Sequence, residues 1–232
     1  MRKMFFAMIF SCCFFSITAM AEQYHDSMCY EYFDTQEMPQ IADLKDIKIY
    51  GVKSSGVVVC IGNKSQYFDW LWQNSIYKLP TVYFDDMDND GEKELCYIAN
   101  LYQGVGTYSQ QLYILDIMEH DDDMIWEEYT FSENDIREQL LKYVSISQYH
   151  NMITVAINDD VVYCDEYAQK QIDNVTLLYP EFTVTDNQIN VTFSIAVFCN
   201  GSVIPYVLHN QIIADIVYYN DSYQLQNIRF SI

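Results

Sequence analysis

Alternating hydrophobic and polar residues run through much of the chain and predict β-strands. The clearest case is residues 189–195, in which Ile, Val, Phe and Ile alternate with Asn, Thr and Ser. A period of two places alternate side chains on opposite faces of a sheet, so this strand should have one buried and one solvated face. By the same reasoning, with β-branched and aromatic enrichment, we expect strands or strand pairs at 47–52, 57–62, 79–84, 95–99, 111–117, 124–131, 146–157, 161–163, 182–185, 188–198, 204–208, 211–219 and 224–232.

Polar residues with turn propensity separate these segments. Asp186-Asn187 is a compact hairpin turn between two strand segments. We also expect turns at 53–56, at Asp159-Asp160, at His209-Asn210 and at 220–222.

Residues 133–143 have the apolar spacing of a helix. Ser132 is placed as the N-cap and Asp135 at the third helical position, which together form a capping box. Ile136, Leu140 and Val144 fall on one face. We therefore predict a mainly β fold, with antiparallel sheets packed as a sandwich or a partial propeller-like assembly and one covering helix. The helix is also a candidate sub-boundary.

The loop from 86 to 94 has the spacing of a calcium site. Calcium takes six to eight oxygen ligands, and Gly91 at position 6 permits a sharp turn. The backbone carbonyl of Glu92 at position 7 is a further candidate ligand. Carboxylates occupy positions 1, 3, 5 and 9: Asp86, Asp88, Asp90 and Glu94.

The loop is not an EF-hand, because position 12 is Tyr97 instead of Glu and both flanks have strand character. An acidic hairpin turn without an ion is the alternative, since Asp-Asn-Asp-Gly suits a turn in any case.

This arrangement resembles the FG-GAP/VCBS-type repeat, a β-hairpin calcium loop of the form Asp-x-Asp-x-Asp-Gly-x-x-Glu/Asp. The likeness covers residues 79–117 and includes the glycine-rich turn 104–107 and the following segment 112–115. It implies a bound Ca²⁺ in a bacterial secreted protein, and it does not specify a biochemical role. One copy is present, whereas a propeller needs several blades. The ligands it implies are Asp86, Asp88, Asp90, the Glu92 carbonyl and Glu94.

The first 21 residues resemble a secretory signal. Two basic residues precede an apolar run, and Ala19-Met20-Ala21 predicts cleavage before Glu22. A lipoprotein signal ending at Cys12 is the alternative. We interpret residues 22–40 as a loose leader and 41–232 as a β-rich calcium-binding domain. No other run approaches the ~20 apolar residues of a membrane span.

The charge of the chain limits its partners. It carries 33 acidic and 12 basic residues, a net charge of −21, which argues against nucleic acid and anionic membranes. Five cysteines follow the predicted signal, without a Cys-x-x-Cys pair. We expect structural thiols, and the sequence does not choose a disulfide pairing among them. They are Cys29, Cys60, Cys96, Cys164 and Cys199.

No catalytic motif stands out. The four histidines are dispersed, and His120 beside three Asp residues is more typical of a solvated turn than of a metal cluster. We therefore expect no enzymatic activity, and a secreted, calcium-stabilised module that binds a protein or glycan partner. One alternative is a glycan-active hydrolase using paired carboxylates, with aromatics near Trp70 and Trp126 lining a subsite. Another is an envelope inhibitor of a basic partner enzyme.

Overall fold

The computed structural model describes residues 38–52, 56–73, 79–102, 108–120, 123–167 and 171–231. The predicted signal at 1–21, its alternative at Cys12, most of the predicted leader, Cys29 and the glycine-rich turn 104–107 lie outside these residues. The chain divides into two compact units, Met1–Asp69 and Trp70–Ile232. The division thus falls between Asp69 and Trp70, and the helix predicted at 133–143 lies inside the second unit.

The first unit contains an antiparallel meander of four strands, in the order β1-β2-β3-β4. The pairing of β2 with β3 confirms the predicted hairpin. Ile47 and Ile49 alternate with exposed or half-buried neighbours along β2, as a strand with one buried face requires. The bounds are β1 Gln40–Leu44, β2 Ile47–Gly51, β3 Val57–Ile61 and β4 Lys64–Phe68.

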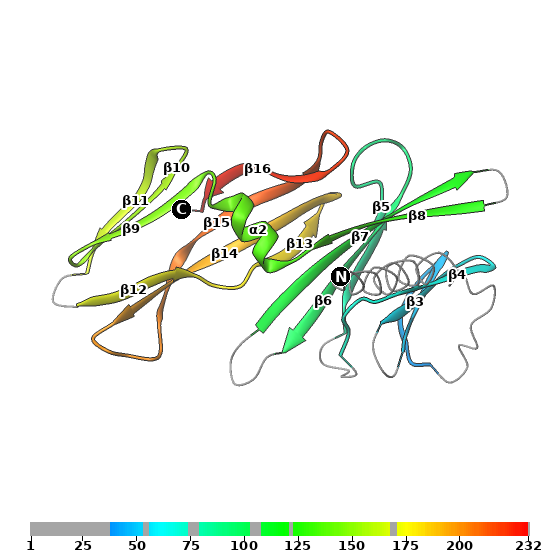
Figure 1. Ribbon diagram of the computed structural model, residues 1–232, viewed down its shortest axis with the longest axis horizontal. Coiled ribbons are helices and arrows are strands. Elements are labelled where there is room, and N and C mark those ends of the chain that lie inside the picture. The colour runs from blue at the N-terminus through cyan, green and yellow to red at the C-terminus, as the bar shows by residue number, and fades with distance from the viewer. Residues whose placement is uncertain are drawn as a thin grey trace, which may run out of the picture. The chain divides into compact units, whose positions relative to one another are not determined.

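The second unit begins with a four-stranded antiparallel sheet in the order β5-β6-β7-β8, shown in Figure 1. Both faces of its central strands are buried. On one face Cys96 of β6 and Ile114 of β7 join the main core, and on the other Trp70 contacts Tyr97 and Tyr113. The bounds are β5 Thr81–Asp85, β6 Glu94–Tyr102, β7 Tyr108–His120 and β8 Asp123–Phe131.

Two further antiparallel sheets follow. One has the order β11-β10-β9, and the other has the order β12-β14-β15-β16, with β13 also pairing with β14 (Figure 1). Asp186 and Asn187 have φ angles of 50° and 61° between β13 and β14, which confirms the predicted tight turn. The bounds are β9 Val144–Tyr149, β10 Met152–Ile157, β11 Asp160–Glu166, β12 Ile172–Leu177, β13 Glu181–Thr185, β14 Gln188–Cys199, β15 Tyr206–Tyr218 and β16 Tyr223–Phe230.

Helix α2, Glu133–Leu140, begins where the sequence predicts and ends earlier. The capping box is present, with the Ser132 hydroxyl accepting from the Asp135 amide at 3.2 Å. Ile136 and Leu140 are fully buried. Val144 is buried too, but as the first residue of β9, where it pairs with Ile157. The helix has already ended before Val144, because the Lys142 amide donates to the Gln139 carbonyl and the Tyr143 amide donates to the Leu140 carbonyl in the turn that follows it.

A single hydrophobic core joins α2 to strands of all three sheets in the second unit. It contains β6 and β7 residues from the first sheet, Ile153 and Val155 from the second, and the inward-facing residues of β14 from the third. Within the described residues the protein is therefore mainly β, with several antiparallel sheets and one α-helix, as predicted. No helix among the described residues is long and apolar enough to cross a membrane.

The turn predicted at His209-Asn210 is wrong, because β15 continues through it from Tyr206 to Tyr218. The pairing of β15 with β14 shifts between Ser194 and Ala196, so the extra residues form a bulge instead of reversing the chain. The amide side chain of Asn210 donates to the Ser231 carbonyl at 2.7 Å, which satisfies the polar group without a turn.

Candidate metal centre

The loop between β5 and β6 is folded by hydrogen bonds from its own backbone amides to its carboxylates. Asp86 accepts from the Asn89 amide at 2.7 Å and from the Gly91 amide at 3.2 Å. Asp88 accepts from the Asp90 amide at 3.0 Å. Asn89 and Gly91 have φ angles of 66° and 98°, a region that suits Asn and Gly. The predicted sharp turn at Gly91 is present.

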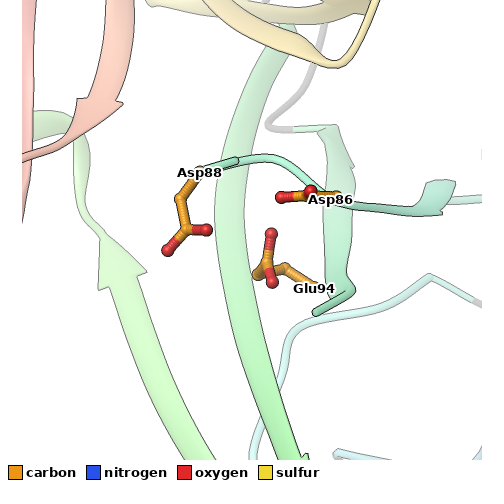
Figure 2. A group of neighbouring side chains, drawn as sticks. All are labelled: Asp86, Asp88 and Glu94. Atoms are coloured by element: carbon orange, nitrogen blue, oxygen red, sulfur yellow. The ribbon is translucent and has the colours of Figure 1, made fainter. Parts of the chain in front are cut away.

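Three of the predicted ligand side chains converge. One carboxylate oxygen from each of Asp86, Asp88 and Glu94 lies within 4.8 Å of the other two (Figure 2). Oxygens bound to one calcium ion at 2.3–2.6 Å are at most about 5 Å apart, so this spacing fits a shared ion. Oxygen-only donors suit a hard cation, and the strand pairing of Asp85 with Glu94 closes the loop.

Glu94 is the buried member of this group, with 1% of its surface exposed. Its Oε2 accepts from the Met87 amide at 2.5 Å, while its Oε1 is buried without a hydrogen-bond partner. Burial raises its pKa to about 7, and the charges of Asp88, Asp116 and Asp90 add to that shift. A buried carboxylate facing other carboxylates is unfavourable unless a cation or proton compensates it.

The two other predicted ligands lie at the surface. Asp90 and Glu92 are exposed, and neither side chain belongs to the convergent group. The Asp90 carboxylate accepts from the Glu92 amide at 2.7 Å, so it shapes the loop. For Glu92 the predicted ligand is the backbone carbonyl oxygen, so the exposure of its side chain does not bear on that prediction.

Sequence reasoning missed Asp116, which lies in the middle of β7. The ladders pair Glu94 with Asp116, and Asp116 with Glu127 on β8. The Oδ1 atom of Asp116 is buried without a hydrogen-bond partner. Burial raises the pKa of Asp116, and the negative charges of Asp90 and Asp88 raise it further. The sequence signal that could have identified Asp116 is an acidic residue within the otherwise apolar run 112–118. Only the register of β7 against β6 places that residue beside the loop.

Met87 connects the loop to the core. It lies between two of the converging acids in sequence, yet only 7% of its surface is exposed and it belongs to the main hydrophobic core. Tyr223 of β16 is buried in the same core, and burial raises its pKa, as do the charges of Glu94, Asp88 and Asp116. The acidic group therefore sits at an edge of the core and not on a freely moving turn.

The aromatic residues considered for a glycan subsite do not form one around Trp70. Its ring is 1% exposed, and it packs on Tyr113 and Tyr97 at centroid distances of 5.2 and 5.0 Å. Its Nε1 donates to Glu128 at 2.8 Å. Trp70 is therefore a core residue, because a buried ring cannot stack on a sugar.

The described cysteines are free thiols: Cys60, Cys96, Cys164 and Cys199. Cys96 is fully buried in β6, and burial raises its pKa to about 12. A thiol of that kind behaves as a small apolar side chain, and Cys96 is part of the hydrophobic core. The His120 side chain lies outside the described part.

Comparisons with protein family models, with curated proteins and with solved structures found no match to this chain. The resemblance of residues 79–117 to the FG-GAP/VCBS repeat therefore stays a prediction.

Proposed function

We propose that this protein is a secreted, calcium-stabilised binding module, whose ion has a structural role. The observation that supports the proposal best is the convergence of Asp86, Asp88 and Glu94 within 4.8 Å, with the buried Glu94 Oε1 lacking a partner. Exposed acidic groups are common without an ion. A buried carboxylate oxygen that lacks a partner and belongs to a group of converging acids is uncommon, because its charge is costly there.

Bound calcium would be held by these three carboxylates and by the Glu92 carbonyl, and would neutralise their mutual repulsion. Because Met87 is part of the core, fixing the acids on either side of it would also fix the β5–β6 loop against that core. The gain in stability is RT ln(1 + [Ca²⁺]/Kd), about 2.7 kcal/mol at a hundredfold excess over Kd. Extracellular calcium modules commonly bind at ~0.1–1 mM, so such a site fills outside cells.

The test is a thermal melt of the purified protein in EDTA, in calcium and in magnesium. A hundredfold excess of calcium over Kd should raise the melting temperature by about 5–10 °C. Asp88→Asn should abolish most of this rise, while its amide oxygen keeps the hydrogen bond from Asp90. Asp160→Asn, at an exposed acid elsewhere, is the matched control and should respond as wild type does.

A wild-type melting temperature that is the same in EDTA and calcium would refute the proposal. The loop would then be an ordinary acidic turn. A rise of equal size in magnesium would refute calcium specificity, because magnesium needs a tighter octahedral site.

A further inference from the structure

A row of acidic residues crosses the first sheet of the second unit beside the proposed calcium site. Asp85, Glu94, Asp116 and Glu127 are direct partners in successive ladders of β5, β6, β7 and β8. Directly opposed residues point to the same face, about 4.5–5.5 Å apart at Cβ, and like charges in such pairs are destabilising. The row therefore needs a compensating charge.

The ends of the row are compensated differently from its middle. Asp85 forms an ion pair with Lys93 at 3.8 Å, and Glu127 is exposed to solvent. Glu94 and Asp116, the central pair, each have one buried oxygen without a hydrogen-bond partner. These are the two buried side-chain oxygens of this kind within the described residues.

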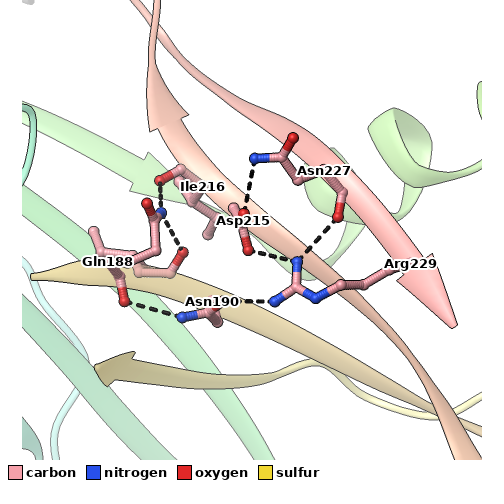
Figure 3. Close-up of polar contacts among 7 residues, drawn as sticks. Gln188, Asn190, Asp215, Ile216, Asn227 and Arg229 are labelled. Carbon is pink, nitrogen blue, oxygen red and sulfur yellow. Dashed lines mark hydrogen bonds and ion pairs between the residues drawn. The ribbon is translucent and has the colours of Figure 1, made fainter. Parts of the chain in front are cut away.

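A strand aspartate elsewhere in this protein shows the usual solution. Asp215 of β15 accepts from Arg229 at 2.7 Å and from Asn227 at 2.9 Å (Figure 3). Arg229 also reaches Asn190 on the other side, so the whole network is internally satisfied. Asp116 faces two acids, Glu94 and Glu127, in its ladders, so its charge needs compensation by a proton or by a cation, directly or through a bound water.

We propose that Asp116 is a further residue of the calcium site, supplied from the neighbouring strand, and that it acts on the ion through a bound water. This inference rests on the proposed calcium site. It assigns to β7 a part in ion binding that the loop motif does not contain.

The geometry favours a water-mediated contact over a direct one. The oxygens of Asp86, Asp88 and Glu94 share the 4.8 Å group, and Asp116 lies outside it. Calcium takes six to eight oxygen ligands. Three carboxylates and one carbonyl provide fewer than that unless several carboxylates bind in bidentate fashion, so waters complete the coordination shell. A carboxylate beside such a water orients it by accepting its hydrogen, and loss of such an outer partner typically costs 10–100-fold in affinity.

The experiment compares calcium affinity, by calorimetry, in wild type, Asp116→Asn and Glu127→Gln. Asp116→Asn should raise the Kd by about 10–100-fold. Glu127→Gln removes the next acid in the same row and should leave the Kd within about threefold, because exposed charges are screened by salt. Asp116→Ser gives a second measure if the Asn variant does not fold.

Terbium(III), a luminescent substitute for calcium, provides an independent readout. Its luminescence lifetimes in H₂O and D₂O count the waters bound to the ion. A water-mediated role predicts the same count in wild type and Asp116→Asn. A count higher by one in the variant would show that Asp116 is a direct ligand, and would overturn the water-mediated assignment.

The other outcomes separate this inference from the proposed function. If wild type does not bind calcium, the calcium site itself is refuted. If wild type binds and Asp116→Asn binds equally well, the site stands and the role of Asp116 is refuted. Equal losses in Asp116→Asn and Glu127→Gln would show a general effect of negative charge and would also refute it.

Discussion

Replacing Glu94 with glutamine should change stability in opposite directions with and without calcium. Oε2 of Glu94 accepts from the Met87 amide, and the amide oxygen of Gln can keep that bond. The new NH₂ group would take the place of the unpartnered Oε1, next to the carboxylates of Asp86 and Asp88. The variant thus keeps the shape of the site and removes one buried negative charge.

The size of the effect follows from the pKa of Glu94. Its value is about 7 in the folded protein against an ordinary 4.5. Each pKa unit corresponds to about 1.4 kcal/mol, so holding this carboxylate charged at pH 8 costs the calcium-free fold up to about 3 kcal/mol. In EDTA at pH 8, Glu94→Gln should therefore melt a few degrees above wild type. In calcium, wild type should gain about 2.7 kcal/mol at a hundredfold excess over Kd, and the variant far less.

Calorimetric melts at pH 8 in EDTA and in calcium measure both effects, with Glu138→Gln on the exposed side of α2 as the matched control. The control should follow wild type in both buffers. A lower melting temperature of Glu94→Gln in EDTA would mean that Glu94 is not a repelled charge. A calcium-induced rise as large as that of wild type would mean that Glu94 is not a ligand. Either result would refute the reasoning.

Three further predictions concern pH, the loop and the core. In EDTA, wild type should lose stability relative to Glu94→Gln as pH rises from about 4.5 to 7, because the raised folded-state pKa favours the protonated form. Urea unfolding at pH 5 and pH 8 measures this, and a relative gain toward pH 8 contradicts it. Met87→Ala should lower the free energy of unfolding in urea by about 2–5 kcal/mol even in EDTA, since Met87 is in the core. Destabilisation that appears only in the presence of calcium would contradict this core role. Trp70→Phe should lower the free energy of unfolding by about 1–3 kcal/mol, because the hydrogen bond to Glu128 is lost. The emission of the remaining tryptophans should lie at longer wavelength than that of wild type. An unchanged free energy of unfolding would contradict a buried Trp70.

Local patterns were sufficient for much of the fold. Strand alternation depends on neighbouring residues, and it located most strands and the tight turn at Asp186-Asn187. The capping box at Ser132 depends on residues three apart and was also found. The acids at positions 86, 88 and 94 were identified because a single hairpin loop brings them together. The prediction at His209-Asn210 was wrong because a polar pair can form a bulge as well as a turn, and the pairing with β14 decides between them.

The sequence by itself determined the strands, the helix start and the acidic loop, since each arises from interactions within about ten residues. Tertiary structure alone decided the register of β7 against β6, which brings Asp116 opposite Glu94 across 22 positions of the chain. It also decided that Met87 and Glu94 are buried while Asp90 is exposed, because burial depends on which other strands cover the loop. Charge and spacing can be read from a short segment, whereas the cost of a charge depends on what surrounds it in three dimensions.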